Sequence, residues 1–329
     1  MAAATLTDQM ERLEAVLGVG ASAPRKRMLV IVNPYATTVS DRLKSLVVSA
    51  LRGRYDVTAL ETEARDHATE LCREAAGEGY DVVVAFGGDG TVNEVANGLA
   101  GSETPLTCLP GGRANVYCRL LGIPHEIVDA TEHILRLADD FQPRMVDLGT
   151  LNGRYFAFSA GVGLDADVVE RVDARPRLKA RLGEWFYTWT AVRTFNRRYL
   201  FHPPRLEATV AEERIDGVSA IVQNGSPYTY FGDRPVEMAA GTALDSGLLS
   251  AIVLERARLT DVAAIAWRAL SERASMGDHR RVRPFPAVTE IQVRSCDERP
   301  LPLQVDGDYI GKSSEAVFGL RARALAVVS

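Results

Sequence analysis

Residues 82–99, VVVAFGGDGTVNEVANGL, decide the fold. The stretch begins with the apolar run Val82–Phe86, which is typical of a buried parallel strand. It ends with Val92–Leu99, whose apolar residues recur at helical spacing. The glycines between them permit positive φ angles and let a ligand approach the backbone, and the N–H groups of such a turn bind anions. The stretch therefore predicts a strand, a phosphate-binding turn and a helix.

The same alternation of strands and helices extends on both sides of this stretch. We expect strands at Met28–Val32, Tyr55–Leu60, Asp81–Phe86 and Leu106–Leu109, and helices at Asp41–Leu51, His67–Ala76, Val92–Leu99 and Ala114–Leu121. Alternation of this kind predicts a doubly wound parallel sheet. Ligands of such sheets bind beyond the carboxyl ends of the strands, where the glycine turn lies.

The second half of the chain has the pattern of antiparallel strands. Asn152-Gly153 predicts a tight hairpin turn, and Asp306-Gly307 predicts a turn from Leu301–Val305 into Tyr309–Ile310. Further strands are expected at Val146–Leu151, Arg154–Ser159, Leu206–Val210, Ser219–Gln223, Leu248–Val253 and Ile291–Arg294, with helical insertions at about 177–195 and 259–274. We therefore expect a flexible tail at 1–26, an α/β domain at 27–144, and a β-rich, sandwich-like domain at 145–329 whose last strand can return to the first domain.

Composition narrows the class of protein. The 329 residues are 47% hydrophobic and 25% charged, with a net charge of −5, which argues for a globular chain that binds no nucleic acid. The longest apolar runs fall far short of the roughly 20 residues of a membrane span. Four scattered cysteines lack metal-ligand spacing, and acidic residues interrupt the N-terminal stretch where a signal peptide would be apolar. We expect a cytoplasmic protein.

A second glycine turn, Pro110-Gly111-Gly112-Arg113-Ala114-Asn115, follows the next expected strand. Two such turns on neighbouring strands indicate one shared crevice for a polyphosphate. Arg113 fits a phosphate clamp, or a solvated residue at a helix start. Asn115 fits a nucleotide contact, or a tie between the two loops.

Three other residues near these turns have ligand-free explanations. Thr91 and Glu94 match a capping box, in which the side chain of each residue accepts a hydrogen bond from the backbone N–H of the other. Asn33-Pro34 ends the first strand at the same edge of the sheet and matches an ordinary Asx turn.

The motifs together resemble a known family. Asn33-Pro34, Gly-Gly-Asp-Gly-Thr at 87–91 with Asn93-Glu94, Leu-Pro-Gly-Gly-x-x-Asn at 109–115 and Val-Asp-Gly-Asp at 305–308 occur in the order found in the diacylglycerol kinase catalytic-domain family. That family includes bacterial soluble lipid kinases and sphingosine kinases, and the resemblance runs from about Met28 to the C-terminus. The Gly-Gly-Asp-Gly motif alone is shared with NAD kinases and phosphofructokinases. Its combination with Val-Asp-Gly-Asp at 305–308 is much more specific for the diacylglycerol kinase family.

The resemblance implies an ATP-dependent lipid kinase that transfers the γ-phosphate to a lipid hydroxyl, as in the conversion of diacylglycerol to phosphatidic acid. The first domain, similar to that of NAD kinases, would hold ATP and Mg²⁺, and the second would hold the lipid. A small-molecule kinase related to NAD kinases and a non-catalytic nucleotide-binding membrane sensor are the alternatives.

The resemblance also implies roles for individual residues. Asp308 would accept the proton of the lipid hydroxyl, Asp89 would organise Mg²⁺ through the ATP phosphates, and Asp306 would position Asp308 or the metal. The implied nucleotide contacts are Asn33, Pro34, Thr37, Thr62, Gly87, Gly88, Asp89, Gly90, Thr91, Asn93, Glu94, Gly112, Arg113 and Asn115.

The chain departs from the family pattern at three places. Tyr35-Ala36-Thr37 replaces the usual x-Ser-Gly after Asn33-Pro34. Asp308 replaces a glutamate, which shortens its reach by about 1.5 Å. Ser246 stands where an aspartate of a structural magnesium site is expected, so Asp245 can serve as the metal ligand only after a local shift.

Two features relate to the lipid. Asp165, in Gly161-Val162-Gly163-Leu164-Asp165-Ala166, fits a headgroup contact or a helix N-cap. Basic residues followed by aromatic ones between Arg175 and Trp189 suit an anionic membrane surface, or a helix packed on the β-rich domain. We expect transient docking at the inner face of the cell membrane, and the sequence leaves a homodimer open.

Overall fold

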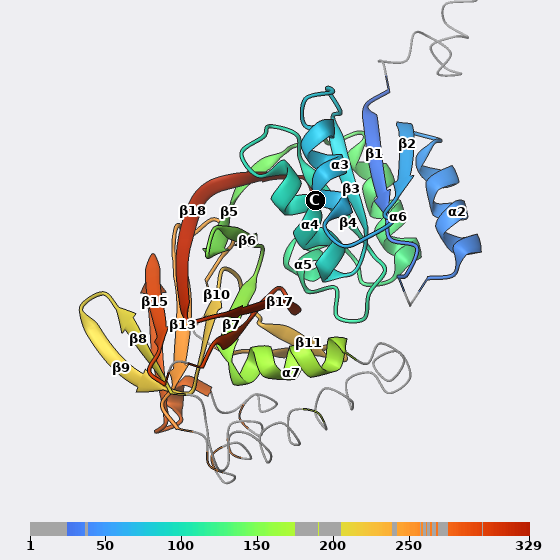
Figure 1. The fold of residues 1–329 in the computed structure, drawn as a ribbon. Helices are drawn as coiled ribbons and strands as arrows, with labels where there is room; N and C mark the ends of the chain where they lie inside the picture. Colours follow the sequence, from blue (N-terminus) through green and yellow to red (C-terminus); the bar gives the residue numbers. More distant parts are fainter. Residues whose placement is uncertain are drawn as a thin grey trace, which may run out of the picture.

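The structure is a computed structural model. It describes residues 25–36, 39–174, 190, 205–238, 242–256, 258, 261, 264, 268, 276–297 and 299–329. An α/β part and a β-rich part lie side by side (Figure 1). Residues 1–24 of the expected tail, most of both expected insertion helices and the basic and aromatic segment Arg175–Trp189 lie outside the described residues.

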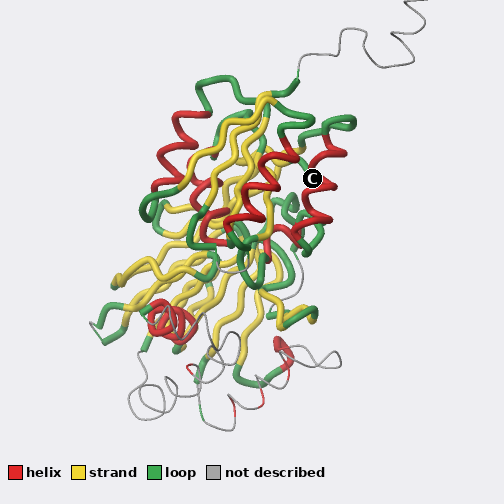
Figure 2. The backbone as a smooth tube through the Cα atoms, turned by 90° about the vertical axis from the view of Figure 1, so that its right-hand side faces the viewer, coloured by secondary structure: helices red, strands yellow, loops and turns green. Residues whose placement is uncertain are grey.

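Four parallel strands form the centre of the α/β part in the order β2-β1-β3-β4. They are β1 Arg27–Val32, β2 Asp56–Glu61, β3 Val82–Gly87 and β4 Leu106–Pro110. The helices α2 Asp41–Leu51, α3 His67–Ala75, α4 Asp89–Leu99, α5 Val116–Leu120 and α6 Ile127–Leu137 lie on both sides of these strands (Figure 2). β3 and β4 are buried throughout, as fully covered parallel strands require. The expected doubly wound sheet is confirmed.

Two helices of this part differ from the expectation. α4 begins at Asp89, three residues before the expected start, so Gly88 is its N-cap. α5 begins at Val116 because Asn115 has a left-handed backbone with φ 44°. A left-handed residue cannot continue a right-handed helix. Both differences place polar residues of the glycine turns at helix starts.

The β-rich part contains antiparallel strands and one described helix. Its strands are β5 Arg144–Leu151, β6 Arg154–Phe156, β7 Ser159–Gly163, β8 Leu206–Val210, β9 Glu213–Gly217, β10 Ser219–Gln223, β11 Thr229–Phe231, β12 Arg234–Val236, β13 Leu249–Leu254, β14 Val282–Val288, β15 Glu290–Ser295, β16 Leu301–Val305 and β17 Asp308–Ser313. The helix α7 spans Leu164–Asp173, and a 3₁₀ turn spans Met276–Asp278. Asn152 and Gly153 have φ angles of 49° and 86° in the β5–β6 turn, so the expected hairpin is confirmed.

The last strand, β18 Glu315–Val327, belongs to both parts of the molecule. It pairs antiparallel with β5 and β15, and its end pairs parallel with β4 at Val327↔Leu106. Figure 1 shows it running from the β-rich part into the α/β part. Phe318 packs in the core of the β-rich part and Leu325 in that of the α/β part. One ten-stranded sheet therefore runs through both parts, next to a six-stranded sheet of order β14-β13-β10-β7-β16-β17.

In the part of the chain that the structure describes, none of the helices combines the length and the apolar character needed to cross a bilayer.

We predict that Gly98→Ala destabilises the fold. Alanine favours a helix over glycine by roughly 0.5–1 kcal/mol. However, a Cβ at Gly98 would lie 2.6 Å from Cβ of Cys72 and 2.7 Å from the carbonyl oxygen of Thr69, because α4 packs closely on α3. Separating two packed helices costs about 1–3 kcal/mol, so the clash should dominate. Urea denaturation should show this loss.

Gly77→Ala is the matched control, because its added Cβ would lie at an ordinary 3.6 Å from the carbonyl oxygen of Glu74. An unchanged or higher free energy of unfolding in Gly98→Ala would contradict the close packing of the two helices.

Candidate active site

The first glycine turn joins β3 to the N-terminus of α4. Gly88 has extended backbone angles and no side chain that could cap the helix, so the N–H groups of the first turn point outward from the helix start. These groups and the helix dipole favour an anion. The capping box expected for Thr91 and Glu94 is wrong, since α4 begins before Thr91.

Glu94 caps a different helix. Its carboxylate accepts hydrogen bonds from the backbone N–H groups of Asp66 (2.9 Å) and Ala68 (3.2 Å), at the start of α3. Asp66 has a left-handed backbone with φ 64°. The loop between β2 and α3 is thereby fixed to α4, the helix that follows the first glycine turn.

The second glycine turn packs directly on the first. The N–H of Gly111 donates to the carbonyl of Gly87 at 2.9 Å. A Cβ at Gly112 would lie 2.7 Å from Cα of Gly88, so a side chain there would force the turns apart. Asn115 closes its own turn through two 2.8 Å hydrogen bonds with the backbone of Gly112, rather than tying one loop to the other.

Asn33 connects the end of β1 to the first turn. Its Nδ2 donates to Oγ1 of Thr91 at 3.0 Å, and its Oδ1 accepts from the N–H of Tyr35 at 2.9 Å. The expected Asx turn is therefore present, and it holds the Asn33 side chain against α4. Three strand ends of one sheet meet at this point.

A cavity of about 460 Å³ opens over these strand ends. Seven of the residues proposed from the sequence line it: Asn33, Thr62, Gly88, Gly90, Thr91, Glu94 and Asp308. Tyr35, Glu63, Ala64 and Arg65 complete the lining. Among the other proposed residues, Pro34, Gly87, Asp89, Asn93, Gly112, Arg113 and Asn115 are described but not part of the lining, and Thr37 lies outside the described residues.

Asp308 reaches this cavity from the β-rich part. It begins β17, and a Cβ on Gly90 would collide with its Oδ2. The absence of a side chain at Gly90 therefore allows the carboxylate to lie against the first glycine turn. Asp308 and Gly90, 218 residues apart in sequence, are neighbours in the fold.

Asp89 links the first glycine turn to α5, the helix that follows the second glycine turn. Its Oδ1 accepts a hydrogen bond from the N–H of Tyr117 at 3.1 Å, at the start of α5. Burial raises the pKa of Asp89 to about 6, although hydrogen bonds from the backbone of Tyr117 and Val116 oppose this rise. The Asp306 and Asp308 carboxylates also raise it. At neutral pH Asp89 is predominantly ionised.

Asp306 holds the two parts of the molecule together. Its carboxylate is buried and accepts hydrogen bonds from the backbone N–H groups of Ala157 (2.7 Å), Phe158 (3.0 Å) and Ser159 (3.0 Å). A fourth comes from Nδ2 of Asn93 in α4, at 2.7 Å. Burial raises the pKa of Asp306, and these hydrogen bonds oppose the rise. Asp306 thus acts on the site by fixing the turn before Asp308.

Sequence reasoning missed two arginines near the cavity. Arg65 donates to the carbonyl of Tyr309 at 2.6 Å, next to Asp308. Arg154 of β6 forms an ion pair with Asp66 at 3.0 Å. Arg65 follows Thr62 at the carboxyl end of β2, and this position beside the expected crevice was the available signal. Arg113, the arginine chosen from the sequence, is exposed.

A known protein family and several known proteins are similar to this chain. A family model of the diacylglycerol kinase catalytic domain matches residues 27–167. A diacylglycerol kinase of Staphylococcus aureus (strain bovine RF122 / ET3-1) is 30% identical over 302 residues, which cover 88% of each chain. The chain belongs to the diacylglycerol kinase family.

Two further proteins that are similar to this chain are also described as diacylglycerol kinases. A diacylglycerol kinase of Bacillus subtilis (strain 168) is 28% identical over 298 residues, which cover 87% of this chain and 91% of its own. A crystal structure of a diacylglycerol kinase from Bacillus anthracis str. Sterne shares the fold, with a TM-score of 0.67 at 20% identity over 93% of this chain and 98% of that one. The resemblance found in the sequence and the expectation of a lipid kinase enzyme are confirmed.

Two acidic residues proposed for this kinase lie away from the cavity. Asp165 is the second residue of α7, whose N-cap is Gly163, so the N-cap interpretation of Asp165 is wrong. Burial raises the pKa of Asp165. Asp245 is exposed, and within the described residues no group of three or more His, Cys, Asp or Glu side chains is arranged to hold a metal ion. The structure gives a metal site at Asp245 no support.

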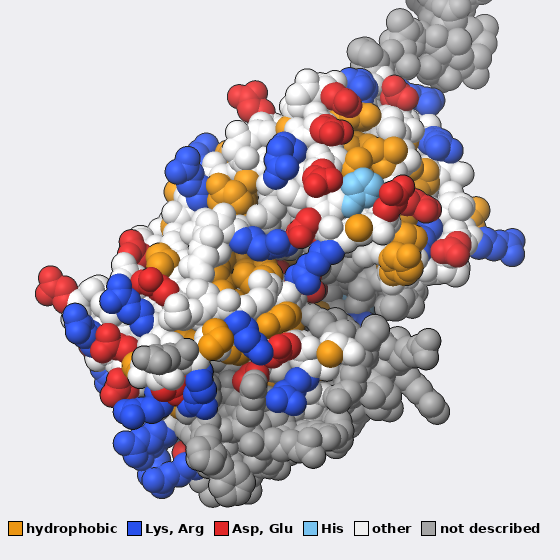
Figure 3. Space-filling view, viewed as in Figure 1, with side chains coloured by type: hydrophobic (Ala, Val, Ile, Leu, Met, Phe, Trp, Pro, Cys, Tyr) orange, Lys and Arg blue, Asp and Glu red, His pale blue; other side chains and the backbone are white. Residues whose placement is uncertain are grey.

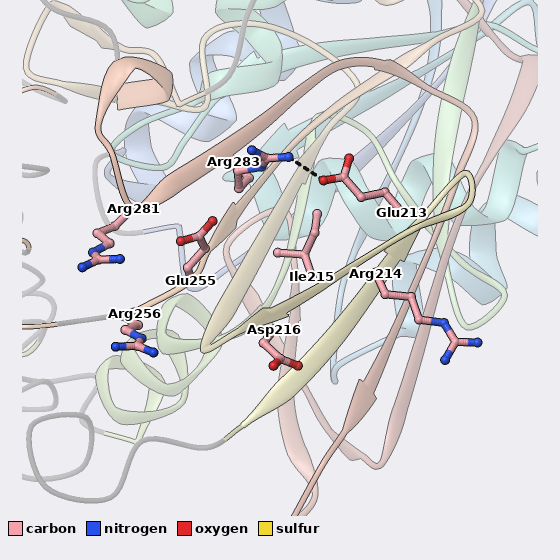
Figure 4. A pocket seen from close by; sticks show the side chains of 8 residues that line it. All are labelled: Glu213, Arg214, Ile215, Asp216, Glu255, Arg256, Arg281 and Arg283. Carbon is pink, nitrogen blue, oxygen red and sulfur yellow. Dashed lines mark hydrogen bonds and ion pairs between the residues drawn. The ribbon is translucent and has the colours of Figure 1, made fainter.

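A second cavity, of about 350 Å³, lies at the outer end of the β-rich part. Figure 4 shows its lining, in which Arg283 and Glu213 point toward each other and form an ion pair, while Arg256 and Arg281 lie on the same side as Glu255. Figure 3 shows acidic and basic side chains interspersed over the exposed face of this end of the kinase. The mixed charges and the distance from the glycine turns make it unsuitable for the nucleotide.

We predict that Asp306→Asn destabilises the kinase. The amide would place an N–H₂ group where two N–H donors now point at a carboxylate oxygen. Losing two hydrogen bonds to a charged group, while leaving their donors buried, costs about 3–5 kcal/mol. The free energy of unfolding in urea should fall by this amount.

Asp245→Asn is the control for this prediction, because Asp245 is exposed. It should change the free energy of unfolding by less than about 0.5 kcal/mol. An equal loss of unfolding free energy in the two variants would contradict the special role of Asp306 and would support a metal site at Asp245.

Proposed function

We propose that the protein transfers the γ-phosphate of ATP to the hydroxyl of diacylglycerol and forms phosphatidic acid. The observation that carries the proposal is the contact between Asp308 and Gly90, which places a carboxylate from the β-rich part on the phosphate-binding turn. Membership of the diacylglycerol kinase family supports the choice of donor and acceptor.

The cavity fits the phosphates of a nucleotide. Its floor is the N-terminus of α4 with the backbone of Gly88 and Gly90, where an anion is stabilised. Asn33 and Thr62 line the adjacent wall. Close contact with a phosphate requires a backbone without side chains, which the paired glycine turns provide.

The acidic residues also fit a magnesium ion held mainly by the nucleotide. Mg²⁺ in kinases is bound by one or two carboxylates together with phosphate oxygens. Asp89 and Asp308 are the carboxylates beside the first glycine turn. When bound, the ion would neutralise charge on the phosphates.

Asp308 acts on the lipid. Its carboxylate accepts the proton of the lipid hydroxyl while the hydroxyl oxygen bonds to the γ-phosphorus and the bond to the β-phosphate breaks. Because an ordinary carboxylate is a weak base, proton transfer is late, and it contributes roughly 10²- to 10⁴-fold to the rate. Positioning and charge stabilisation supply most of the remainder.

The test is transfer of radiolabel from γ-labelled ATP to dioleoylglycerol in detergent micelles. We expect labelled phosphatidic acid from the wild type and a loss of at least about 100-fold in Asp308→Asn. ATP affinity of this variant, measured by calorimetry, should change by less than about threefold, because Asp308 is one of many contacts.

Two results would contradict the proposal. Label in NADP after incubation with NAD, with none in the lipid, would indicate a small-molecule kinase. ATP binding that leaves every added lipid unlabelled would indicate a non-catalytic sensor.

A second prediction compares the two arginines. Both arginines are exposed, but Arg65 lines the cavity and Arg113 lies outside its lining. Arg65→Ala should therefore weaken ATP binding by roughly 10- to 100-fold, the value of a charge-assisted hydrogen bond. Arg113→Ala should change it by less than about threefold. The reverse ranking of ATP dissociation constants would show that Arg113 is the phosphate clamp, as the sequence suggested.

A further inference from the structure

A chain of hydrogen bonds runs through the β-rich part to the turn that carries Asp308. Oη of Tyr228 donates to Oδ1 of Asp165 at 2.7 Å, and Nε2 of Gln304 donates to Oδ2 of Asp165 at 2.7 Å. The N–H of Gly307 donates to Oε1 of Gln304 at 2.9 Å. Gln304 is fully buried, so its side-chain amide is shielded from solvent.

Both ends of this chain fix the orientation of the Gln304 amide. Oδ2 of Asp165 accepts a hydrogen bond from Nε2 of Gln304, and the backbone N–H of Gly307 can only donate one. A flipped amide would place Oε1 against Asp165 and Nε2 against the N–H of Gly307, losing both bonds. Because unsatisfied polar groups are costly in a buried site, Asp165 determines how Gln304 presents its oxygen to Gly307.

The neighbouring strand β7 leaves space for the side chains of Asp165 and Gln304. Gly161 of β7 lies opposite Gln304 in the β7–β16 register. A Cβ on Gly161 would collide with Oδ2 of Asp165 and lie 3.0 Å from Nε2 of Gln304. A side chain at position 161 would therefore separate the two groups.

The turn that receives the last hydrogen bond directly precedes the presumed base. Asp306 and Gly307 have left-handed φ angles of 47° and 82°. The Asp306 carboxylate holds one side of this turn through residues 157–159, and Gln304 holds the Gly307 amide. The direction of the next side chain, Asp308, depends on both anchors.

We propose that Asp165 and Gln304 are positioning residues: Asp165 orients the amide of Gln304, and Gln304 fixes the Gly307 amide so that Asp308 lies against Gly90. The inference rests on the proposed role of Asp308 and assigns Asp165 a task other than contact with the lipid headgroup. It predicts that removing either residue acts on phosphoryl transfer more than on nucleotide binding.

The first experiment compares Gln304→Leu, Asp165→Ala and the double variant in the micelle assay. We expect kcat to fall by up to about 100-fold in each single variant, because small displacements of a reacting group have effects of this size. The ATP dissociation constant should stay within about threefold of the wild type. Since both residues act through one hydrogen bond, the double variant should lie within about threefold of Gln304→Leu.

Gln223→Leu is the matched control. Gln223 is a buried glutamine in the same sheet, opposite Ser159 in the β7–β10 register, and its Nε2 donates to the carbonyl of Gly225 at 3.1 Å, whereas the Gly307 amide bonds Gln304. It should lower the melting temperature as Gln304→Leu does, without the selective loss of kcat. Multiplied losses in the double variant, with a raised KM for the lipid in Asp165→Ala, would overturn the inference and indicate a headgroup contact.

The second experiment measures hydrogen exchange at the Gly307 amide and needs no substrate. Losing the bond to Gln304 should accelerate exchange by about 2- to 10-fold in Gln304→Leu and Asp165→Ala. Gly161→Ala keeps both side chains but separates them, so it should have the same effect. Wild-type exchange in these variants would overturn the inference. An inactive wild type would contradict the proposed function alone, and Gly307 exchange would still decide the positioning role.

Discussion

The buried carboxylate of Asp306 is the contact on which the rest of the site depends. It accepts one hydrogen bond from Asn93 of α4 and three from backbone groups of the β-rich part. A buried carboxylate without these donors would be strongly destabilised, so the two parts are held in one arrangement. The start of α4 and the start of β17 are thereby fixed next to each other.

The second constraint is the close approach of backbone groups in the site, which depends on the arrangement that Asp306 holds. The glycine turns after β3 and β4 touch each other, and Asp308 lies against Gly90. Side chains at these positions would force apart the groups that line the cavity. Chemistry in this site therefore relies on where backbone groups and one carboxylate are held, as phosphoryl transfer requires.

Local patterns in the sequence predicted the four parallel strands, helices α2 to α5, several strands of the β-rich part, the Asn152-Gly153 hairpin and both glycine turns, because periodicity and turn chemistry act over a few residues. The strands β9 and β14 and the helix α6 were not expected. Contacts between distant residues were not predictable in this way. Glu94 caps a helix that starts nearly 30 residues earlier in the chain, and Asp306 bonds Asn93 across 213 residues. β18 joins both parts through pairings that no local pattern specifies.

The most direct test of this account is a crystal structure of the protein with a non-hydrolysable ATP analogue and Mg²⁺. The account predicts that the terminal phosphate lies over the N-terminus of α4, between the backbone of Gly90 and the carboxylate of Asp308. A nucleotide bound elsewhere, such as in the arginine-lined cavity of the β-rich part, would contradict it. So would a terminal phosphate at the glycine turns with Asp308 directed away from it.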